Sequence, residues 1–214
     1  ISLSGENVSR MNGSRYAKEV SAVLTDRISL DNCTAWDVVA MGRNPHTGFF
    51  GSLTAEDRRR VRESLEACDA WMLRDRLFHR LSDGQKQKVL IARGLCQSTP
   101  VLLLDEPTSH LDLYAQTALE KALADYEGTV LMVTHDFYLA AGCADYILLV
   151  EDHTVRRMRT RKFRKMVYDK YFDSAYLETD RKKQELEAAI TTAFKKNDLA
   201  AVDKLCGQLE ELMS

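Results

Sequence analysis

The residues with the clearest chemical meaning are two adjacent carboxylates, Asp105 and Glu106, which directly follow the apolar run Val101–Leu104. Charge beside a buried strand is costly unless a cation or hydrogen bonds compensate it. Mg²⁺ prefers one or two carboxylates together with waters and phosphate oxygens. We therefore expect Asp105 to hold a Mg²⁺ ion that carries phosphate, and Glu106 to orient or deprotonate the attacking water. An Asp-Glu pair taken alone is more often an ordinary solvated turn.

Two further groups are candidates for contacts with an anion. Ser82, with Gln85 three residues later, has the pattern of a capping box and predicts a helix that begins at Ser82. Such a helix end offers backbone N–H groups and a positive dipole to a phosphate; an ordinary capping box is the alternative. His135 follows a second apolar run, and a packed or surface histidine is the alternative to a catalytic one.

A strand–helix–strand unit is expected to position these groups. Val101–Leu104 is apolar throughout, as a buried parallel strand would be. Leu113–Glu127 has the spacing of an amphipathic helix, with Asp112 as its N-cap and Gly128 as its C′ residue. Thr129–Thr134 is the second strand. In a right-handed crossover both strands end at one edge of a parallel sheet, where open α/β sheets bind ligands.

The remaining pattern gives shorter elements. Strands are expected at 1–3, 19–24 and 146–150, helices at 34–41 and 54–70, a loop at 42–53 and a helical hairpin from about residue 175. Thr54 opens the second of these helices, with an acidic residue three positions later as in a capping box. Seven basic residues and no acidic one occupy Arg156–Lys165. That run predicts either a solvated strand-to-helix connection or a surface for phosphate groups.

Composition limits the class of protein. The chain has 214 residues, 45% hydrophobic and 29% charged, and a net charge of −2. The length leaves room for one ordinary folded domain, or one domain with an appendage, and the near-neutral net charge selects neither nucleic acid nor an acidic membrane as a partner. The five cysteines are widely spread and form no C-x-x-C pair, so we expect reduced thiols in a cytosolic compartment. No apolar run reaches the roughly 18–20 residues that cross a bilayer.

The order and spacing of these motifs resemble the ATPase cassette of the ABC superfamily. The resemblance rests on LSDGQ at 81–85, the strand ending in DEPTSHLD at 105–112, and TVLMVTHD at 129–136. It covers roughly residues 1–158 and implies an α/β, P-loop NTPase-like cassette with a parallel sheet. A helical signature subdomain at about 34–95 belongs to this cassette. Residues 159–214 then form a separate basic connector and helical hairpin.

The resemblance also implies the roles of the site residues. The cassette would pair head to tail with a second cassette and enclose two ATP molecules with Mg²⁺. Ser82 and Gly84 would touch the γ-phosphate of ATP held mainly by the other subunit. Gln85 of the signature and Asp112 of the D-loop would also belong to the nucleotide-binding residues. Glu106 would be the general base, Asp105 would hold Mg²⁺, and His135 would contact the γ-phosphate.

Three departures from the family pattern bear on activity. No glycine is followed by lysine, so the Walker A loop G-x-x-x-x-G-K-[ST] is absent. We expect this chain alone to bind ATP poorly, and truncation explains the gap better than degeneration. Thr25 and Asp26 stand where the family carries a Gln that senses Mg²⁺, so Thr25 is at best a partial substitute. Asp83 replaces the commoner Gly of the signature.

Two branches of the superfamily remain open. Residues 37–51 and 81–95 resemble ATPase subunits of iron-siderophore, haem and cobalamin importers, in which residues 34–80 would receive a membrane permease. Such a subunit would be cytoplasmic and peripheral on the inner face of the plasma membrane. From about residue 118 the chain resembles ABC-F proteins, and Arg156–Lys165 would then contact ribosomal RNA. We favour the importer; a non-catalytic pseudo-cassette and a sequence joined near the D-loop are further alternatives.

Overall fold

A computed structural model describes residues 2–3, 5–24, 30–48, 51–151 and 153–171, together with the single positions 182, 186, 189 and 208. The chain divides into two compact units, Ile1–Ala144 and Asp145–Ser214, and each is treated by itself below. Apart from those four single positions, the expected helical hairpin beyond residue 175 lies outside the described residues, as does the candidate residue Thr25.

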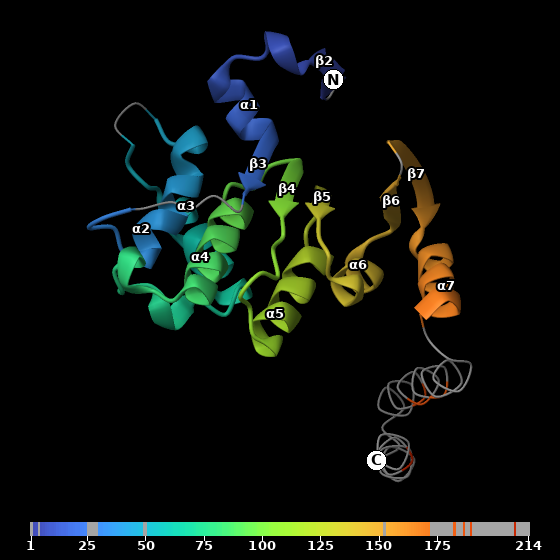
Figure 1. Ribbon diagram of the computed structural model, residues 1–214. Coiled ribbons are helices and arrows are strands. Elements are labelled where there is room, and N and C mark those ends of the chain that lie inside the picture. The colour runs from blue at the N-terminus through green and yellow to red at the C-terminus, as the bar shows by residue number, and fades with distance from the viewer. Residues whose placement is uncertain are drawn as a thin grey trace. The chain divides into compact units, whose positions relative to one another are not determined.

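The first unit is built on a three-stranded parallel sheet in the order β3-β4-β5 (Figure 1). Its strands are β3 (Val20–Val23), β4 (Val101–Asp105) and β5 (Thr129–Val133). In β4, Leu102 and Leu104 are buried, which is the physical reason for its apolar run. The expected parallel pairing of the two apolar runs is confirmed, because β4 and β5 pair directly from their first residues to their last.

Helix α5 (Leu113–Ala124) connects β4 to β5. Asp112 caps its N-terminus through its side chain, as expected, and the face carrying Leu119 and Leu123 is buried. The prediction that Gly128 ends this helix is wrong, since the helix is already capped at Asp125. Position 128 requires glycine for a different reason. A Cβ there would lie 2.7 Å from the carbonyl oxygen of Pro100, the residue before β4, so only glycine fits.

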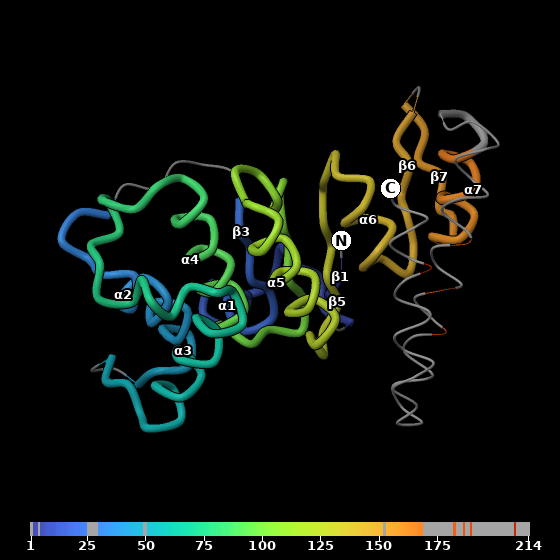
Figure 2. Tube along the Cα trace, turned by 90° about the horizontal axis from the view of Figure 1, so that it is seen from below, coloured from blue at the N-terminus to red at the C-terminus, as the bar shows by residue number. Residues whose placement is uncertain are grey.

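Helices α2 (Ala35–Ala40), α3 (Ala55–Ala67) and α4 (Asp83–Cys96) gather beside β3 (Figures 1 and 2). Each begins with a capping box in which a side-chain oxygen at the N-cap accepts a backbone N–H and the third residue reciprocates. Their apolar faces form the core, where Val38, Val61, Leu65, Phe78 and Val89 are almost fully buried. Each such side chain contributes roughly 1.5–3 kcal/mol by leaving water.

Shorter elements complete this unit. They are β1 (Ser2–Leu3), β2 (Glu6–Asn7), α1 (Gly13–Glu19), α6 (Phe137–Cys143) and the 3-10 helices η1 (Val8–Arg10), η2 (Met41–His46), η3 (Trp71–Leu73) and η4 (Phe78–Arg80). The sequence pattern of residues 1–25 predicted strands alone and missed helix α1. Asn12 is the N-cap of this helix, and its side-chain oxygen accepts a hydrogen bond from Arg15 N–H at 2.8 Å. The expected loop at 42–53 likewise begins with the helical turn η2.

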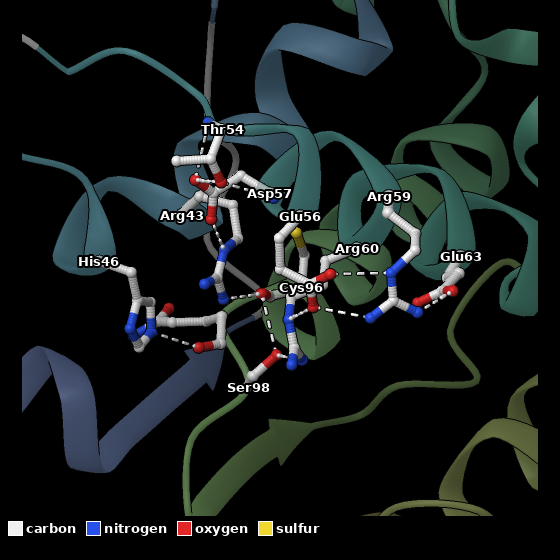
Figure 3. Close-up of polar contacts among 11 residues, drawn as sticks. Arg43, His46, Thr54, Glu56, Asp57, Arg59, Arg60, Glu63, Cys96 and Ser98 are labelled. Atoms are coloured by element: carbon white, nitrogen blue, oxygen red, sulfur yellow. Dashed lines mark hydrogen bonds and ion pairs between the residues drawn. The ribbon is translucent and has the colours of Figure 1, made fainter.

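A buried ion pair fastens η2 to α3 and to the end of α4 (Figure 3). Arg43 Nε lies 2.9 Å from Asp57 Oδ1, and its Nη1 donates to the Cys96 carbonyl at 2.9 Å. Hydrogen bonds from the Thr54 side chain and then from Arg43 lower the pKa of Asp57 from 3.8 to about 2. The same carboxylate therefore caps α3 and compensates a buried cation.

The second unit contains the antiparallel strands β6 (Tyr146–Glu151) and β7 (Thr154–Arg159), followed by α7 (Thr160–Tyr171). The expected strand at 146–150 is confirmed, but the basic run 156–165 is no loose connection: it forms most of β7 and the start of α7. Within it, Arg156 pairs with Glu151, and Arg157 stacks over the Tyr146 ring at 3.9 Å.

Candidate functional site

Glu106 and His135 meet at the carboxyl edge of the parallel sheet. Glu106 lies directly after β4, and its backbone N–H donates to the Val133 carbonyl of β5 at 2.8 Å. His135 lies just beyond β5, where its Nε2 is 3.3 Å from Glu106 Oε1 and its backbone N–H donates to Glu106 Oε2 at 3.4 Å. The expectation that both polar strand ends share one edge is therefore met in the structure.

The two side chains differ sharply in exposure. His135 is 96% exposed, whereas the Glu106 side chain is only 23% exposed. Glu106 Oε1 is buried and has no hydrogen-bond partner among the residues that the structure describes, although His135 Nε2 lies 3.3 Å from it. A buried carboxylate oxygen whose nearby polar group is an exposed imidazole, with no hydrogen bond formed, is unusual and calls for an explanation. An acceptor of this kind, beside an exposed imidazole, is suited to taking a proton from a water or another small donor placed there.

The backbone at Glu106 is strained. Its φ is 44°, in the left-handed region that residues other than Gly, Asn and Asp seldom adopt. Such a conformation costs on the order of 1–3 kcal/mol and persists only when surrounding contacts hold it. The hydrogen bond to Val133 and the turn in which Ser109 N–H donates to the Glu106 carbonyl at 3.1 Å are two of those contacts. The carboxylate is thus aimed by the fold.

Asp105 is the last residue of β4 and pairs with Val133. As one carboxylate at the ligand-binding edge of a parallel sheet, it suits a cation whose other ligands are waters and phosphate oxygens. Across the part of the chain that the structure describes, no group of three or more His, Cys, Asp or Glu side chains could hold a metal by itself. The Asp105 carboxylate by itself suits a Mg²⁺ ion whose other ligands are waters and phosphate oxygens.

The signature residues form the N-terminus of α4. Gln85 N–H donates to the Ser82 hydroxyl at 3.3 Å, and Ser82 N–H donates to Gln85 Oε1 at 3.2 Å. Both side chains are thus used in the capping box. The Asp83 side chain is 65% exposed and lies 3.5 Å from Lys86 Nζ, so it points to solvent.

Gly84 brings α4 against the segment that follows β4. A Cβ at Gly84 would lie 2.4 Å from the His110 carbonyl oxygen, so that only glycine allows this approach. One turn later, Gln87 Nε2 donates to the Pro107 carbonyl at 3.4 Å. The structure thus brings the signature helix next to the segment that carries Glu106.

Asp112 serves as the exposed N-cap of α5 and accepts from Ala115 N–H at 2.8 Å. Sequence reasoning missed Gln87 and the carbonyls of Pro107 and His110. No local signal identifies them, because a backbone carbonyl is present at every residue. The one available hint was the Gly at position 84, next to a cap that needed no glycine.

No helix among the described residues is long and apolar enough to cross a bilayer.

The chain also matches known proteins in sequence. Residues 1–109 match the family model described as ABC transporter. An uncharacterised ABC transporter ATP-binding protein of Methanocaldococcus jannaschii is 42% identical over 159 residues, which is 72% of this chain and 55% of that protein. The iron(3+)-hydroxamate import ATP-binding protein FhuC of Bacillus subtilis is 35% identical over 159 residues, 72% of this chain and 59% of FhuC. The chain thus spans somewhat more than half the length of these relatives.

Solved structures show the same fold. A metal-chelate type ABC transporter in an inward-facing conformation is 29% identical, with a TM-score of 0.58 over 67% of this chain and 59% of that chain. A dimeric ATP-binding cassette bound to ADP and phosphate is 24% identical, with a TM-score of 0.64 over 74% of this chain and 72% of that chain. At that identity the second likeness bears on the fold alone.

Proposed function

The chain belongs to the ABC transporter family, and on that premise we propose that it is the larger part of an ATP-hydrolysing subunit that drives an importer of iron chelates, haem or cobalamin. The observation that carries this proposal is the buried, unsatisfied Oε1 of Glu106 beside His135 at the carboxyl edge of the sheet. Relatives named for import of iron(3+)-hydroxamate, hemin and cobalamin support the substrate class.

In the proposed reaction, Glu106 takes a proton from the attacking water, and its strained backbone keeps the carboxylate aimed at that water. Exposed His135 contacts the γ-phosphate and stays within reach of Glu106. Asp105 would hold the Mg²⁺ ion. When bound, Mg²⁺ and ATP supply the electrophilic phosphorus and neutralise the charge that develops on the phosphate oxygens.

Two partners follow from the proposal. A second cassette would bring its own signature helix to this site, so Ser82, Gly84 and Gln85 of one chain would serve ATP on the other. A membrane permease would bind the helical region 34–80, which places the protein at the inner face of the plasma membrane. In that region Met72 is 81% exposed, and the Trp71 ring is flanked by Arg62 and Arg74 at 5.1 and 4.6 Å.

This chain alone is proposed to bind ATP weakly, because no glycine is followed by lysine and the loop that cradles phosphates has no counterpart in it. Titration of the 214-residue chain with a fluorescent ATP analogue tests this directly. The same titration on a chain extended at its N-terminus by a Walker A segment should give far tighter binding. Tight binding by the unextended chain would contradict the proposal.

Glu106→Gln in the extended, ATP-hydrolysing protein tests the catalytic assignment. We expect turnover to fall by about 10²–10⁴-fold, the usual worth of a general base, while ATP binding is kept. Glu127→Gln, an exposed carboxylate beyond α5, is the matched control and should hydrolyse ATP normally. Equal turnover in Glu106→Gln and Glu127→Gln would remove Glu106 from the mechanism.

Copurification separates the importer from the ribosome-associated alternative. The importer predicts that a permease copurifies with the protein from membranes. The ABC-F alternative predicts salt-sensitive cosedimentation with ribosomes that weakens when residues 156–165 are neutralised. The contacts of Arg156 with Glu151 and of Arg157 with Tyr146 support the first, since they already use part of that basic run within the hairpin.

A further inference from the structure

We propose that Gly84 and Gln87, on the first turns of α4, are positioning residues for Glu106, because they hold the segment Glu106–His110 from which that carboxylate projects. Gly84 lies against the His110 carbonyl at the far end of the segment, and Gln87 binds the Pro107 carbonyl near Glu106. The inference rests on the proposed function only in taking Glu106 as the base. Its physical content, a mechanical link within one chain between the signature helix and the carboxylate, stands on geometry alone.

Residues Glu106–His110 form a short, strained arc of backbone. Both of its terminal residues have left-handed backbones, with φ of 44° at Glu106 and 64° at His110. Inside it, Ser109 N–H donates to the Glu106 carbonyl at 3.1 Å. Leu111, the next residue after the segment, donates its N–H to the Thr108 carbonyl at 3.1 Å. Two consecutive hydrogen-bonded turns leave few free torsions, so a displacement at one end is passed to the other.

Helix α4 fixes the His110 end of this arc. The atom that a Cβ at Gly84 would meet at 2.4 Å is the His110 carbonyl oxygen, which is backbone and cannot rotate away as a side chain would. The helix and the arc must therefore separate if position 84 gains a methyl group. Gln87 adds a second attachment near the other end, at the Pro107 carbonyl.

The Glu106 end is fixed by β5. Glu106 N–H donates to the Val133 carbonyl, and the carboxylate contacts His135 just beyond that strand. A left-handed backbone relaxes when its restraints loosen. Loosening the α4 end should therefore release the arc, weaken the hydrogen bond of Glu106 to β5, and turn the carboxylate away from His135.

Hydrogen–deuterium exchange of the 214-residue chain tests the link without nucleotide. The variants are Gly84→Ala and Gln87→Met, which removes only the bond to Pro107. The control is Gly142→Ala, because a Cβ at Gly142 has nothing within 4 Å. We expect Gly84→Ala to speed exchange across 106–111 by at least about tenfold, with a smaller rise in Gln87→Met and none in the control.

A purely structural role would speed exchange everywhere, so the amides of α2 and α3 serve as internal reference and should not change in Gln87→Met. If Gly84→Ala does not fold, Gln87→Met decides the question. Unchanged exchange at 106–111 in the folded variants, or a rise that the reference helices share, overturns the proposal. Because no ATP is involved, this outcome is independent of whether Glu106 is the base.

Discussion

The buried pair between Arg43 and Asp57 allows a quantitative prediction. Asp57→Asn keeps the shape of the side chain but removes the charge, so the guanidinium of Arg43 is left buried and unpaired. Breaking a buried pair on one side costs about 3–5 kcal/mol. We expect the free energy of unfolding of the first unit to fall by that amount.

The opposite single change should cost less. Arg43→Met retains much of the buried stem, and Asp57 keeps two donors from Thr54, the backbone N–H at 3.0 Å and the hydroxyl at 2.7 Å. The Cys96 carbonyl loses its donor. A cost of about 1–3 kcal/mol follows from one uncompensated buried polar group. The double variant should be no worse than Asp57→Asn alone, since its apolar replacement removes the unpaired cation.

Urea unfolding followed by tryptophan fluorescence measures the free energy of unfolding of the first unit, because both tryptophans, Trp36 and Trp71, lie in it. The coupling free energy should be at least about 1–3 kcal/mol, in the sense that the double variant is more stable than the sum of its parts. Costs that add to within about 0.5 kcal/mol would refute the account of Arg43 and Asp57 as a compensated buried pair.

The pH dependence gives a second check on the same carboxylate. Its pKa is lowered from 3.8 to about 2, so the stabilisation is complete above pH 3.8 and is lost as the pH falls toward and through about 2. At about 1.36 kcal/mol per pH unit this amounts to roughly 2 kcal/mol. The wild-type chain should lose that much between pH 5 and pH 2 relative to Asp57→Asn, and the two should approach each other in acid.

Three other outcomes are expected. Gly94→Ala should destabilise the chain by about 1–3 kcal/mol in urea unfolding, because its Cβ would lie 2.7 Å from Val23 Cγ2 in the core. Glu106→Gly should raise the unfolding free energy by about 1 kcal/mol, since glycine adopts the left-handed φ without strain, while ATP turnover in the extended protein is lost. Burial raises the pKa of Cys68 to about 12 and of Cys96 to about 11, so iodoacetamide at pH 8 should label both at least about a hundredfold more slowly in the folded chain than in the unfolded one.

Structural features that depend on residues close together in the sequence could be predicted from it. The capping boxes at Thr54 and Ser82 each depend on one side chain three positions away, and the structure contains both. The apolar runs gave β4 and β5, and their parallel pairing put Glu106 and His135 at one edge. Helix α1 was missed because its seven residues have no buried side chain, and so no apolar periodicity marks it.

Structural features that depend on contacts between segments far apart in the sequence could not be predicted from it. Arg43 and Asp57 are ordinary charged residues in the sequence, and only the packing of η2 on α3 makes them a buried pair. The close contact of Gly84 with the His110 carbonyl joins residues that are 26 positions apart in the sequence. A glycine also has several local explanations, as the wrong assignment of Gly128 to a helix end shows. Tertiary packing selects among them.

The strain at Glu106 connects stability with function. Local preference alone would place glycine at a φ of 44°, yet the chain carries a residue whose side chain has an unsatisfied buried oxygen. Both features reduce stability, since among the described residues no hydrogen bond reaches Oε1 and the polar group near it is the exposed His135 imidazole. Glu106 is unfavourable by two independent criteria, as residues at functional sites often are, and this agrees with the general-base role proposed for its carboxylate. The same reasoning accounts for why the surrounding arc is pinned at both ends: without those attachments the backbone would relax, and the carboxylate would no longer be aimed.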